Sequence, residues 1–317
     1  MNLNNINKSL KIALLGGGIS AERQVSLSSA QSVCQALQDL GFQVTNIDPK
    51  NQEQLQQLIT DNFDLAYIAL HGKGGEDGTI QGFLETINLI YTGSGIHSSA
   101  TCIDKIKSKQ VFDSCNINTP KSIYLYNKSQ FSISEVDKNI GYPCVVKAAS
   151  EGSTVGIYLV NNSTELNKAV ENAFELDKNI LIEKFISGKE YTVGVLGNSN
   201  PQALPVIEII PKNGFYDYEA KYAEGGSIHI CPAEIDSVST KELQDMAINA
   251  HIALNCKGIS RSDMIRDDKG KFWLLEVNTV PGMTKTSLVP DAAKVAGISF
   301  QELCLKIIAY ALENKKG

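Results

Sequence analysis

The chain has 317 residues, of which 43% are hydrophobic, and its formal net charge is -6 at pH 7. A chain of this length and composition buries a sizeable core and usually divides it among two or three domains. The acidic balance and the absence of a long basic run exclude nucleic acid and anionic membrane surfaces as partners and favour small molecules. The apolar run from Ile12 to Leu15 is too short for a signal-peptide core or a membrane span, which predicts a cytoplasmic protein.

Seven cysteines are scattered singly along the chain, without a C-x-x-C pair and without a histidine at zinc-ligand spacing. This pattern predicts small core residues in a reducing cytosol and not a disulfide framework. We therefore expect free thiols at all seven positions.

The first part of the chain alternates strand and helix patterns. Apolar runs predict strands at 11–15, 44–47 and 65–70, and apolar periodicity predicts helices at 27–40 and 52–59. Such alternation indicates a parallel sheet, whose ligand sites lie where the strands end, here in the loops 16–22 and 71–78. We therefore expect a Rossmann-like α/β domain over residues 1–98.

Beyond residue 98 the regular alternation stops. A helix over 99–116, strands at 144–148 and 156–160 and a helix at 163–176 predict an α+β domain over 99–188. Strands near 180–185, 191–196 and 203–210, a helix at 240–255, a hairpin at 259–277 and two terminal helices complete the chain. They predict a third, larger domain over 189–317.

The predicted hairpin carries the sharpest chemical signal. A two-residue turn at 269–270 sets a register in which Asp263 faces Glu276, and Arg261 then faces Asn278. Because side chains alternate along a strand, all four project from one face. Two carboxylates and an amide oxygen suit magnesium, which also takes substrate phosphates. A solvated hairpin with ordinary charge pairs is the alternative, but polar residues that interrupt an apolar run favour the metal site.

A nucleotide site is indicated by a group of residues and not by one motif. Lys147 ends an apolar strand and precedes the small-residue loop 150–156, whose backbone N–H groups suit phosphates. The chain has no Walker motif, and a glycine-bearing turn between strands is more often only a turn. The stronger signal is the combination with Lys105 on the preceding helix and with Glu183 and Glu190 around the next strand.

The order of these residues resembles the ATP-grasp ligases. Within that superfamily the chain resembles the D-alanine–D-alanine ligase family over nearly its whole length, because several long strings occur in the expected order. These strings are GGGISAER at 16–23, LHGKGGEDG at 70–78, YTGSG at 91–95, FYDYEAKY at 215–222 and PGMT at 281–284. The family usually carries Pro and Arg where Ala148 and Ser150 stand, and Trp where Phe185 stands. These departures bear on nucleotide affinity and not on the reaction.

The resemblance implies an ATP-grasp architecture and the ligation of two D-alanine molecules for peptidoglycan precursor synthesis. ATP would phosphorylate the carboxylate of the first D-alanine, and the amine of the second would attack the acyl phosphate. Two Mg²⁺ ions, or Mn²⁺ in their place, and a homodimer are implied as well.

The resemblance also implies a role for each site residue. Catalytic roles are implied for Glu22, Ser153, Tyr222 and Arg261, and substrate binding for Glu22, His71, Gly282, Ser287 and Leu288. ATP binding is implied for Lys105, Lys147, Glu183, Lys184, Phe185, Ile186, Glu190 and Lys221, and metal binding for Asp263, Glu276 and Asn278. Ser153 and Tyr222 match residues that hydrogen-bond to Glu22, so that the segment 214–226 resembles a lid that excludes water.

Two other functions stay open at the level of the sequence. The pattern G-x-G-x-x-A at 16–21, with Asp48 ending the next strand, matches a dinucleotide fingerprint and suits a nicotinamide-dependent oxidoreductase. However, the helix is expected to begin later than that fingerprint requires, and the hairpin carboxylates have no role in hydride transfer. A non-catalytic nucleotide-binding protein is the second alternative. Without the resemblance, Glu22 would be a first-turn helix acid and His71 a turn histidine bonded to backbone.

Overall fold

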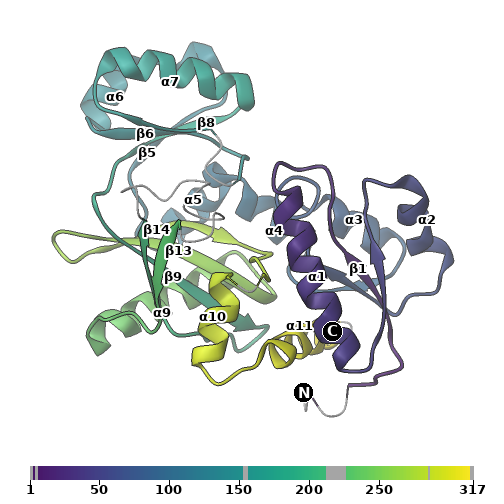
Figure 1. Ribbon diagram of the computed structural model, residues 1–317. Coiled ribbons are helices and arrows are strands. Elements are labelled where there is room, and N and C mark those ends of the chain that lie inside the picture. Colours follow the sequence, from purple (N-terminus) through teal and green to yellow (C-terminus); the bar gives the residue numbers. More distant parts are fainter. Residues whose placement is uncertain (1–2, 4–5, 153–155, 212–225, 285, 315–317) are drawn as a thin grey trace.

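The computed structural model describes residues 3, 6–152, 156–211, 226–284 and 286–314. Three β-sheets organise the chain, and Figure 1 shows them as three lobes, with the small central lobe standing above the other two. The expected combination of an N-terminal parallel sheet with further α+β sheets is therefore confirmed.

The N-terminal sheet is parallel throughout, in the strand order β2-β1-β3-β4. Its strands are β1 (Lys11–Leu15), β2 (Gln43–Ile47), β3 (Leu65–Ile68) and β4 (Ile90–Tyr91), and its helices are α1 (Arg23–Asp39), α2 (Gln52–Thr60), α3 (Thr79–Thr86) and α4 (Ile96–Ile103). The loops that follow β1 and β3 open at the same edge of the sheet. They meet where Ser20 Oγ donates to the carbonyl oxygen of His71 at 2.6 Å.

Helix α1 begins at Arg23, earlier than the expected start at Leu27. The apolar periodicity starts only at Val25, so the pattern missed the first turn. Polar contacts set that turn, because the N–H groups of Glu22 and Arg23 donate to the hydroxyl and the carbonyl of Ser20, each at 3.2 Å. The position of the helix therefore does not argue against a dinucleotide fingerprint.

The central sheet is antiparallel, in the order β5-β8-β6-β7. Its strands are β5 (Ser122–Leu125), β6 (Cys144–Ala148), β7 (Ile157–Val160) and β8 (Ile180–Lys184), and the helices of this part are α5 (Lys105–Ser114), a 3-10 turn (Lys128–Gln130), α6 (Ile133–Asn139) and α7 (Ser163–Leu176). Helices α6 and α7 cover the upper face in Figure 1, where Val146, Val170 and Ile182 belong to a small apolar core. Helix α5 contacts β8 and β14, and so lies at the junction with the lobe below.

The third sheet has the order β12-β11-β9-β13-β14, with β10 paired to β9. Its strands are β9 (Gly188–Gly197), β10 (Gln202–Ala203), β11 (Ile207–Pro211), β12 (Ser227–Ile230), β13 (Gly258–Asp267) and β14 (Phe272–Asn278), and its helices are α9 (Ser237–Ala253), α10 (Leu288–Val295) and α11 (Phe300–Asn314). Helix α9 packs on the sheet through a core that includes Val193, Leu243 and Met264. Helix α11 lies beside α1, and Leu37 and Ile308 share one core, so the two ends of the chain pack together.

The turn between β13 and β14 is longer than expected. The N–H of Gly270 donates to the carbonyl of Asp267, and the N–H of Asp267 donates to the carbonyl of Lys271, each at 2.9 Å. The loop therefore spans 268–270, and the expected two-residue turn at 269–270 is wrong. Gly270 has a φ of +83°, which a glycine adopts without strain.

A β-bulge restores the register that the longer turn shifts. Asp263 pairs with Glu276, while the next residue of β13 pairs with Leu274, so that Leu275 is the extra residue on β14. The two shifts cancel, and Arg261 faces Asn278 as predicted. The four polar residues therefore share one face, although the turn that was expected to place them there is different.

All seven cysteines are free thiols in the structure.

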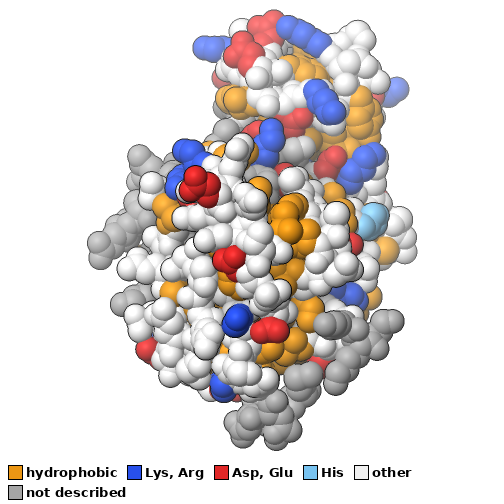
Figure 2. Space-filling model, turned by 90° about the vertical axis from the view of Figure 1, so that its right-hand side faces the viewer, with side chains coloured by type: hydrophobic (Ala, Val, Ile, Leu, Met, Phe, Trp, Pro, Cys, Tyr) orange, Lys and Arg blue, Asp and Glu red, His pale blue; other side chains and the backbone are white. Residues whose placement is uncertain are grey.

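Among the described helices none is long and apolar enough to cross a membrane alone, and α10 and α11 pass that test only as a pair bent by 105°. Figure 2 shows that charged side chains gather on the central lobe and around its junction with the body of the molecule.

Candidate active site

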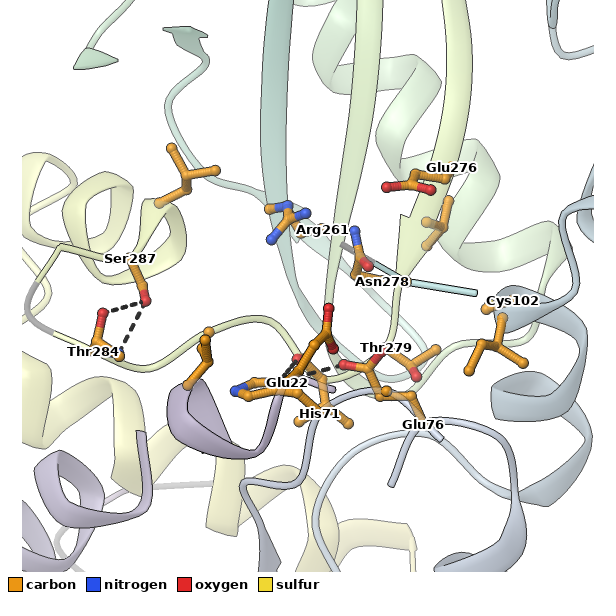
Figure 3. Close-up of a pocket in the computed structure, with 18 of the residues that line it drawn as sticks. Glu22, His71, Glu76, Cys102, Arg261, Glu276, Asn278, Thr279, Thr284 and Ser287 are labelled. Carbon is orange, nitrogen blue, oxygen red and sulfur yellow. Dashed lines mark hydrogen bonds and ion pairs between the residues drawn. The ribbon is translucent and has the colours of Figure 1, made fainter. Parts of the chain in front are cut away.

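A cavity of about 550 Å³ opens where the three lobes meet. The start of α1, the loop after β3, the α4–α5 junction and the β13–β14 hairpin contribute to its wall (Figure 3). Many of the residues predicted for the site line this cavity, namely Glu22, His71, Lys105, Arg261, Glu276, Asn278, Gly282, Ser287 and Leu288.

Glycines from two loops close around the carboxylate of Glu22. A Cβ added at Gly72 would lie 3.1 Å from Glu22 Oε2, and one added at Gly152 would lie 3.1 Å from Oε1. Glu22 is only 8% exposed, and Figure 3 shows its side chain in the middle of the site. The small-residue loop between β6 and β7 therefore reaches Glu22, although Ser153 itself lies outside the described residues.

His71 links three segments of the chain. Its Nδ1 lies 3.0 Å from the carbonyl oxygen of Val280, which can only accept, so Nδ1 carries the proton. Its Nε2 lies 3.0 Å from Ser29 Oγ, and Ser29 Oγ accepts from the N–H of Met283 at 3.1 Å. The ordinary interpretation of His71 as a histidine bonded to backbone is correct in geometry, and the bond holds the loop beside Gly282 in place.

The loop that leads into α10 brings Gly282 close to the side chain of Ser287. A Cβ at Gly282 would lie 2.7 Å from Ser287 Oγ, so the backbone there needs a glycine. Ser287 Oγ accepts from the N–H of Thr284 at 3.0 Å and immediately precedes Leu288, the first residue of α10. The N-terminus of a helix favours anions, so this corner of the cavity suits a carboxylate.

Arg261 and Asp263 form a two-pronged ion pair on β13. Arg261 Nε and one terminal nitrogen donate to the two oxygens of Asp263 at 2.9 Å and 2.7 Å. Thr192 Oγ1 also donates to Asp263 at 2.7 Å, and Asn278 Nδ2 lies 3.3 Å from it. Glu276, opposite Asp263 on β14, is 26% exposed and lies 3.7 Å from the ammonium of Lys105.

The hairpin fits a magnesium ion by its donor chemistry. Mg²⁺ takes one or two carboxylates and completes its octahedron with water and phosphate oxygens. Glu276 and Asn278 both line the cavity, whereas Asp263 is not among the lining residues and has both oxygens bonded to Arg261. Glu276 and Asn278 can therefore bind the ion in their present positions. Asp263 can bind it once Arg261 releases one of the two carboxylate oxygens.

A buried cluster of charges lies at the base of the central lobe. Lys109 and Lys147 contact opposite oxygens of Glu183, and Lys109 also donates to Thr119 Oγ1 at 2.6 Å. Burial alone would raise the pKa of Glu183, but the two lysines lower it to about 2. Burial acts against the charge of Lys147 too, and its carboxylate partner more than compensates and raises its pKa.

The other predicted nucleotide residues follow this cluster along the chain. Lys184 is exposed, Phe185 and Ile186 are half-buried, and the N–H of Phe185 donates to the carbonyl of Pro143 at 3.3 Å. Glu190, also half-buried, lies on β9 opposite Ile265. Lys221 and Tyr222 lie outside the described residues, as does the expected lid over 214–226 except for Gly226.

The glycine loop after β1 is filled by its own chain. The N–H of Gly18 donates to Asp48 Oδ1 at 2.9 Å, and Arg23 pairs with Asp48 at 2.7 Å. A Cβ at Gly17 would lie 2.7 Å from the Asp48 carboxyl carbon. A pyrophosphate would meet this carboxylate, so the structure does not favour the dinucleotide interpretation.

Several site residues were missed from the sequence. Lys109 follows Lys105 by one helical turn, and an exposed charged face would give the same spacing. Thr192 and Ser29 are fully enclosed polar residues within apolar elements. A small polar residue inside an apolar pattern is a weak signal, because many such residues only bond to backbone.

Two family models match the chain. One is described as D-ala D-ala ligase N-terminus and matches residues 48–94, and the other is described as D-ala D-ala ligase C-terminus and matches residues 111–309. A D-alanine–D-alanine ligase of Carboxydothermus hydrogenoformans is 45% identical over 97% of this chain and 100% of its own length. The corresponding protein of Buchnera aphidicola is 47% identical over 94% of this chain and 98% of its own.

Solved structures agree with these relatives. The D-alanine–D-alanine ligase from Bacillus anthracis complexed with ATP superposes with a TM-score of 0.85 at 33% identity, covering 97% of this chain and 99% of that one. The VanG D-Ala:D-Ser ligase from Enterococcus faecalis superposes with a TM-score of 0.83 at 31% identity, covering 96% of this chain and 100% of that one.

Proposed function

The chain belongs to the D-alanine–D-alanine ligase family, and we propose that it joins two D-alanine molecules into a dipeptide for peptidoglycan precursor synthesis. It uses ATP and Mg²⁺ and produces ADP and phosphate. The observation that carries this proposal is the convergence in one cavity of a buried carboxylate, an arginine, a helix N-terminus and the metal-type hairpin. Each of these groups can bind one of the charged groups of the reactants.

The first D-alanine binds between the lobes. Its ammonium group pairs with Glu22, and its carboxylate points to the hairpin and to the side where Lys105 and Lys147 hold the phosphates of ATP. The adenine lies against the segment Lys184 to Ile186, with Glu183 and Glu190 at its edges. In this position the γ-phosphoryl group passes to the carboxylate, which gives D-alanyl phosphate and ADP.

Glu276, Asn278 and Asp263 would hold magnesium, which would supply charge neutralisation at the phosphate oxygens. Arg261 is placed beside the same hairpin face and stabilises the oxyanion when the amine of the second D-alanine attacks. The N–H of Gly282 shares that oxyanion, and phosphate then leaves as the amide forms.

The second D-alanine binds at the N-terminus of α10. Ser287 and the backbone N–H of Leu288 hold its carboxylate, where the helix dipole favours an anion. His71 supports this subsite indirectly, because its bond to Val280 and its link through Ser29 fix the loop that carries Gly282. The amine is then free to face the acyl phosphate.

Further parts of the proposal concern the lid, the domains and the assembly. Lys221 and Tyr222 complete the site from a lid over 214–226, and Ser153 completes it from the loop 150–156, with Tyr222 and Ser153 bonded to Glu22. The chain divides into domains at 1–98, 99–188 and 189–317, works as a homodimer and is cytoplasmic. Neither nucleic acid nor a membrane is a partner.

A coupled assay of phosphate release tests the reaction. We expect ATP-dependent phosphate release with D-alanine and Mg²⁺, and much less with L-alanine, D-lactate or D-serine as the sole substrate, with dipeptide formed in step with phosphate. Phosphate release that does not depend on D-alanine, or ATP turnover without dipeptide, would refute the proposal.

A further inference from the structure

Lys109 shares the Glu183 carboxylate with Lys147 but is enclosed more completely. The side chain of Lys109 is 1% exposed and that of Lys147 is 12% exposed. Lys109 Nζ is anchored twice, by Thr119 Oγ1 at 2.6 Å and by Glu183 Oε2 at 2.9 Å. Lys147 instead lies one residue before the end of β6, shortly before the loop that reaches Glu22, and the carboxylates of Glu276 and Glu190 also act on its charge. Lys109 is therefore enclosed and anchored more firmly than Lys147.

Lys109 and Lys147 share the one carboxylate of Glu183, so that only one of the two lysines is needed to balance its charge. A buried carboxylate needs a cation and hydrogen bonds, because its isolated charge is very costly away from water. Burial pushes the pKa of Glu183 upward, and the charge of Lys109 is the largest single contribution that brings it down to about 2, followed by the charge of Lys147. Lys109 alone can therefore balance the charge of Glu183, which leaves Lys147 able to turn to another anion.

We propose that Lys109 is a positioning residue for ATP, which retains Glu183 in place and ionised while Lys147 exchanges that carboxylate for the nucleotide phosphates. The inference rests on the proposed assignment of Lys147 to ATP. Lys109 itself contacts no substrate in this role. Lys109 frees Lys147 to leave Glu183, because the buried carboxylate still has Lys109 as its cation when Lys147 turns to the phosphates.

The Lys109→Met variant gives the first measurement. Methionine replaces the apolar stem of the lysine, so packing is retained while the charge is lost. Lys147 then becomes the remaining cation of Glu183, and binding of ATP must break that pair. We expect affinity for a non-hydrolysable ATP analogue to fall roughly tenfold to a hundredfold, the scale of a hydrogen bond to a charged group. The conservative Lys109→Arg variant is expected to retain affinity within a few-fold.

A second substitution separates positioning from a purely structural role. In the Glu183→Gln background no carboxylate retains Lys147, so adding Lys109→Met should reduce affinity for the analogue much less there than in the wild-type background. If Lys109 only supported the fold, Lys109→Met would reduce affinity equally in both backgrounds. Calorimetry on the two single variants and the double variant, with urea unfolding as the check on folding, measures this. Wild-type affinity in Lys109→Met, or an equal loss in both backgrounds, overturns the inference.

A structure of the wild-type chain with the analogue decides the question even if Lys109→Met does not fold. The inference expects Lys109 still bonded to Glu183 and Lys147 Nζ on a phosphate oxygen. Lys147 remaining on Glu183 in the presence of bound analogue overturns it. If the wild-type chain does not bind the analogue at all, the proposed nucleotide site fails, and the inference fails with it. Binding in the wild type without the expected exchange overturns the inference alone.

Discussion

Two glutamates of the candidate site, Glu183 and Glu276, lie beside lysines, and they differ in how completely they are enclosed. Glu183 is 4% exposed and bonded on both oxygens, with Lys109 at 2.9 Å. Glu276 is 26% exposed, and Lys105 lies 3.7 Å away. The enclosed carboxylate has little room for another cation, whereas the open one faces the cavity and can take a metal at modest cost. Burial, more than the presence of a lysine, therefore separates a carboxylate held by the lysines of the chain from one that is open to a metal.

The largest expected effect comes from removing the open carboxylate. Glu276→Ala should reduce magnesium-dependent turnover about a thousandfold or more, because the charge stabilisation that the metal supplies amounts to several kcal/mol. Stability should change by no more than about 1 kcal/mol, since the side chain is partly exposed. Steady-state kinetics against magnesium concentration and urea unfolding measure both. Glu302→Ala, at an exposed position on α11, is the matched control. Turnover near the wild-type value at ordinary magnesium concentration would remove Glu276 from the metal site.

The enclosed carboxylate should behave in the opposite way. Glu183→Ala leaves two buried lysines without their anion, and the free energy of unfolding should fall by about 3–5 kcal/mol. The control is Glu171→Ala, whose partner Lys128 is also exposed and whose loss should cost less than about 1 kcal/mol. Urea unfolding compares the two. Equal losses would mean that the cluster at Glu183 is hydrated like a surface pair.

The same carboxylate predicts a pH dependence of stability. The pKa of Glu183 falls from an ordinary 4.5 to about 2 in the folded chain. Because the folded chain has the lower pKa, the ionised carboxylate stabilises the fold fully at pH values above the pKa of the unfolded chain. This contribution is lost as the pH falls from 4.5 toward 2. The contribution amounts to roughly 3 kcal/mol. Glu183→Gln should lack it, so the variant should lose less stability over this interval in urea unfolding. Parallel curves for the wild type and the variant would contradict the assignment.

The sequence predicted the difference between Glu183 and Glu276 only in part. The shared face of Asp263 and Glu276 was predicted correctly although the turn was wrong, because the longer turn and the bulge at Leu275 each shift the register and cancel. A strand pattern reports which face a side chain takes, and it contains no signal for two compensating irregularities. The parallel sheet was predictable for a similar reason, since continuous apolar runs indicate strands covered on both faces.

Lys109 could not be predicted in the same way. On the helix pattern it is one of several lysines, and nothing in the spacing distinguishes a solvated lysine from one buried against β8. Its burial depends on Glu183, which lies far away in sequence and meets it only after the central sheet packs on α5. Arg23 and Asp48 show the same limit, because their pairing fills a glycine loop that the sequence alone allowed as a nucleotide site.

The smallest expected effect concerns the other lysine of α5. Lys105→Met removes an ion pair at 3.7 Å to Glu276 and a hydrogen bond at 2.6 Å to the carbonyl of Glu151, while the methionine keeps the apolar stem packed. We expect a stability loss of about 1 kcal/mol, because the carboxylate it leaves behind is open to solvent. Lys109→Met, one turn along the same helix, should cost about 2–3 kcal/mol, because it removes a buried hydrogen bond to a charged group and leaves Thr119 without that donor. Urea unfolding of the two variants therefore compares the two environments with the same substitution on the same helix. If Lys105→Met cost as much as Lys109→Met, Glu276 would be held as tightly as Glu183, and the reason for expecting it to accept a metal would be lost.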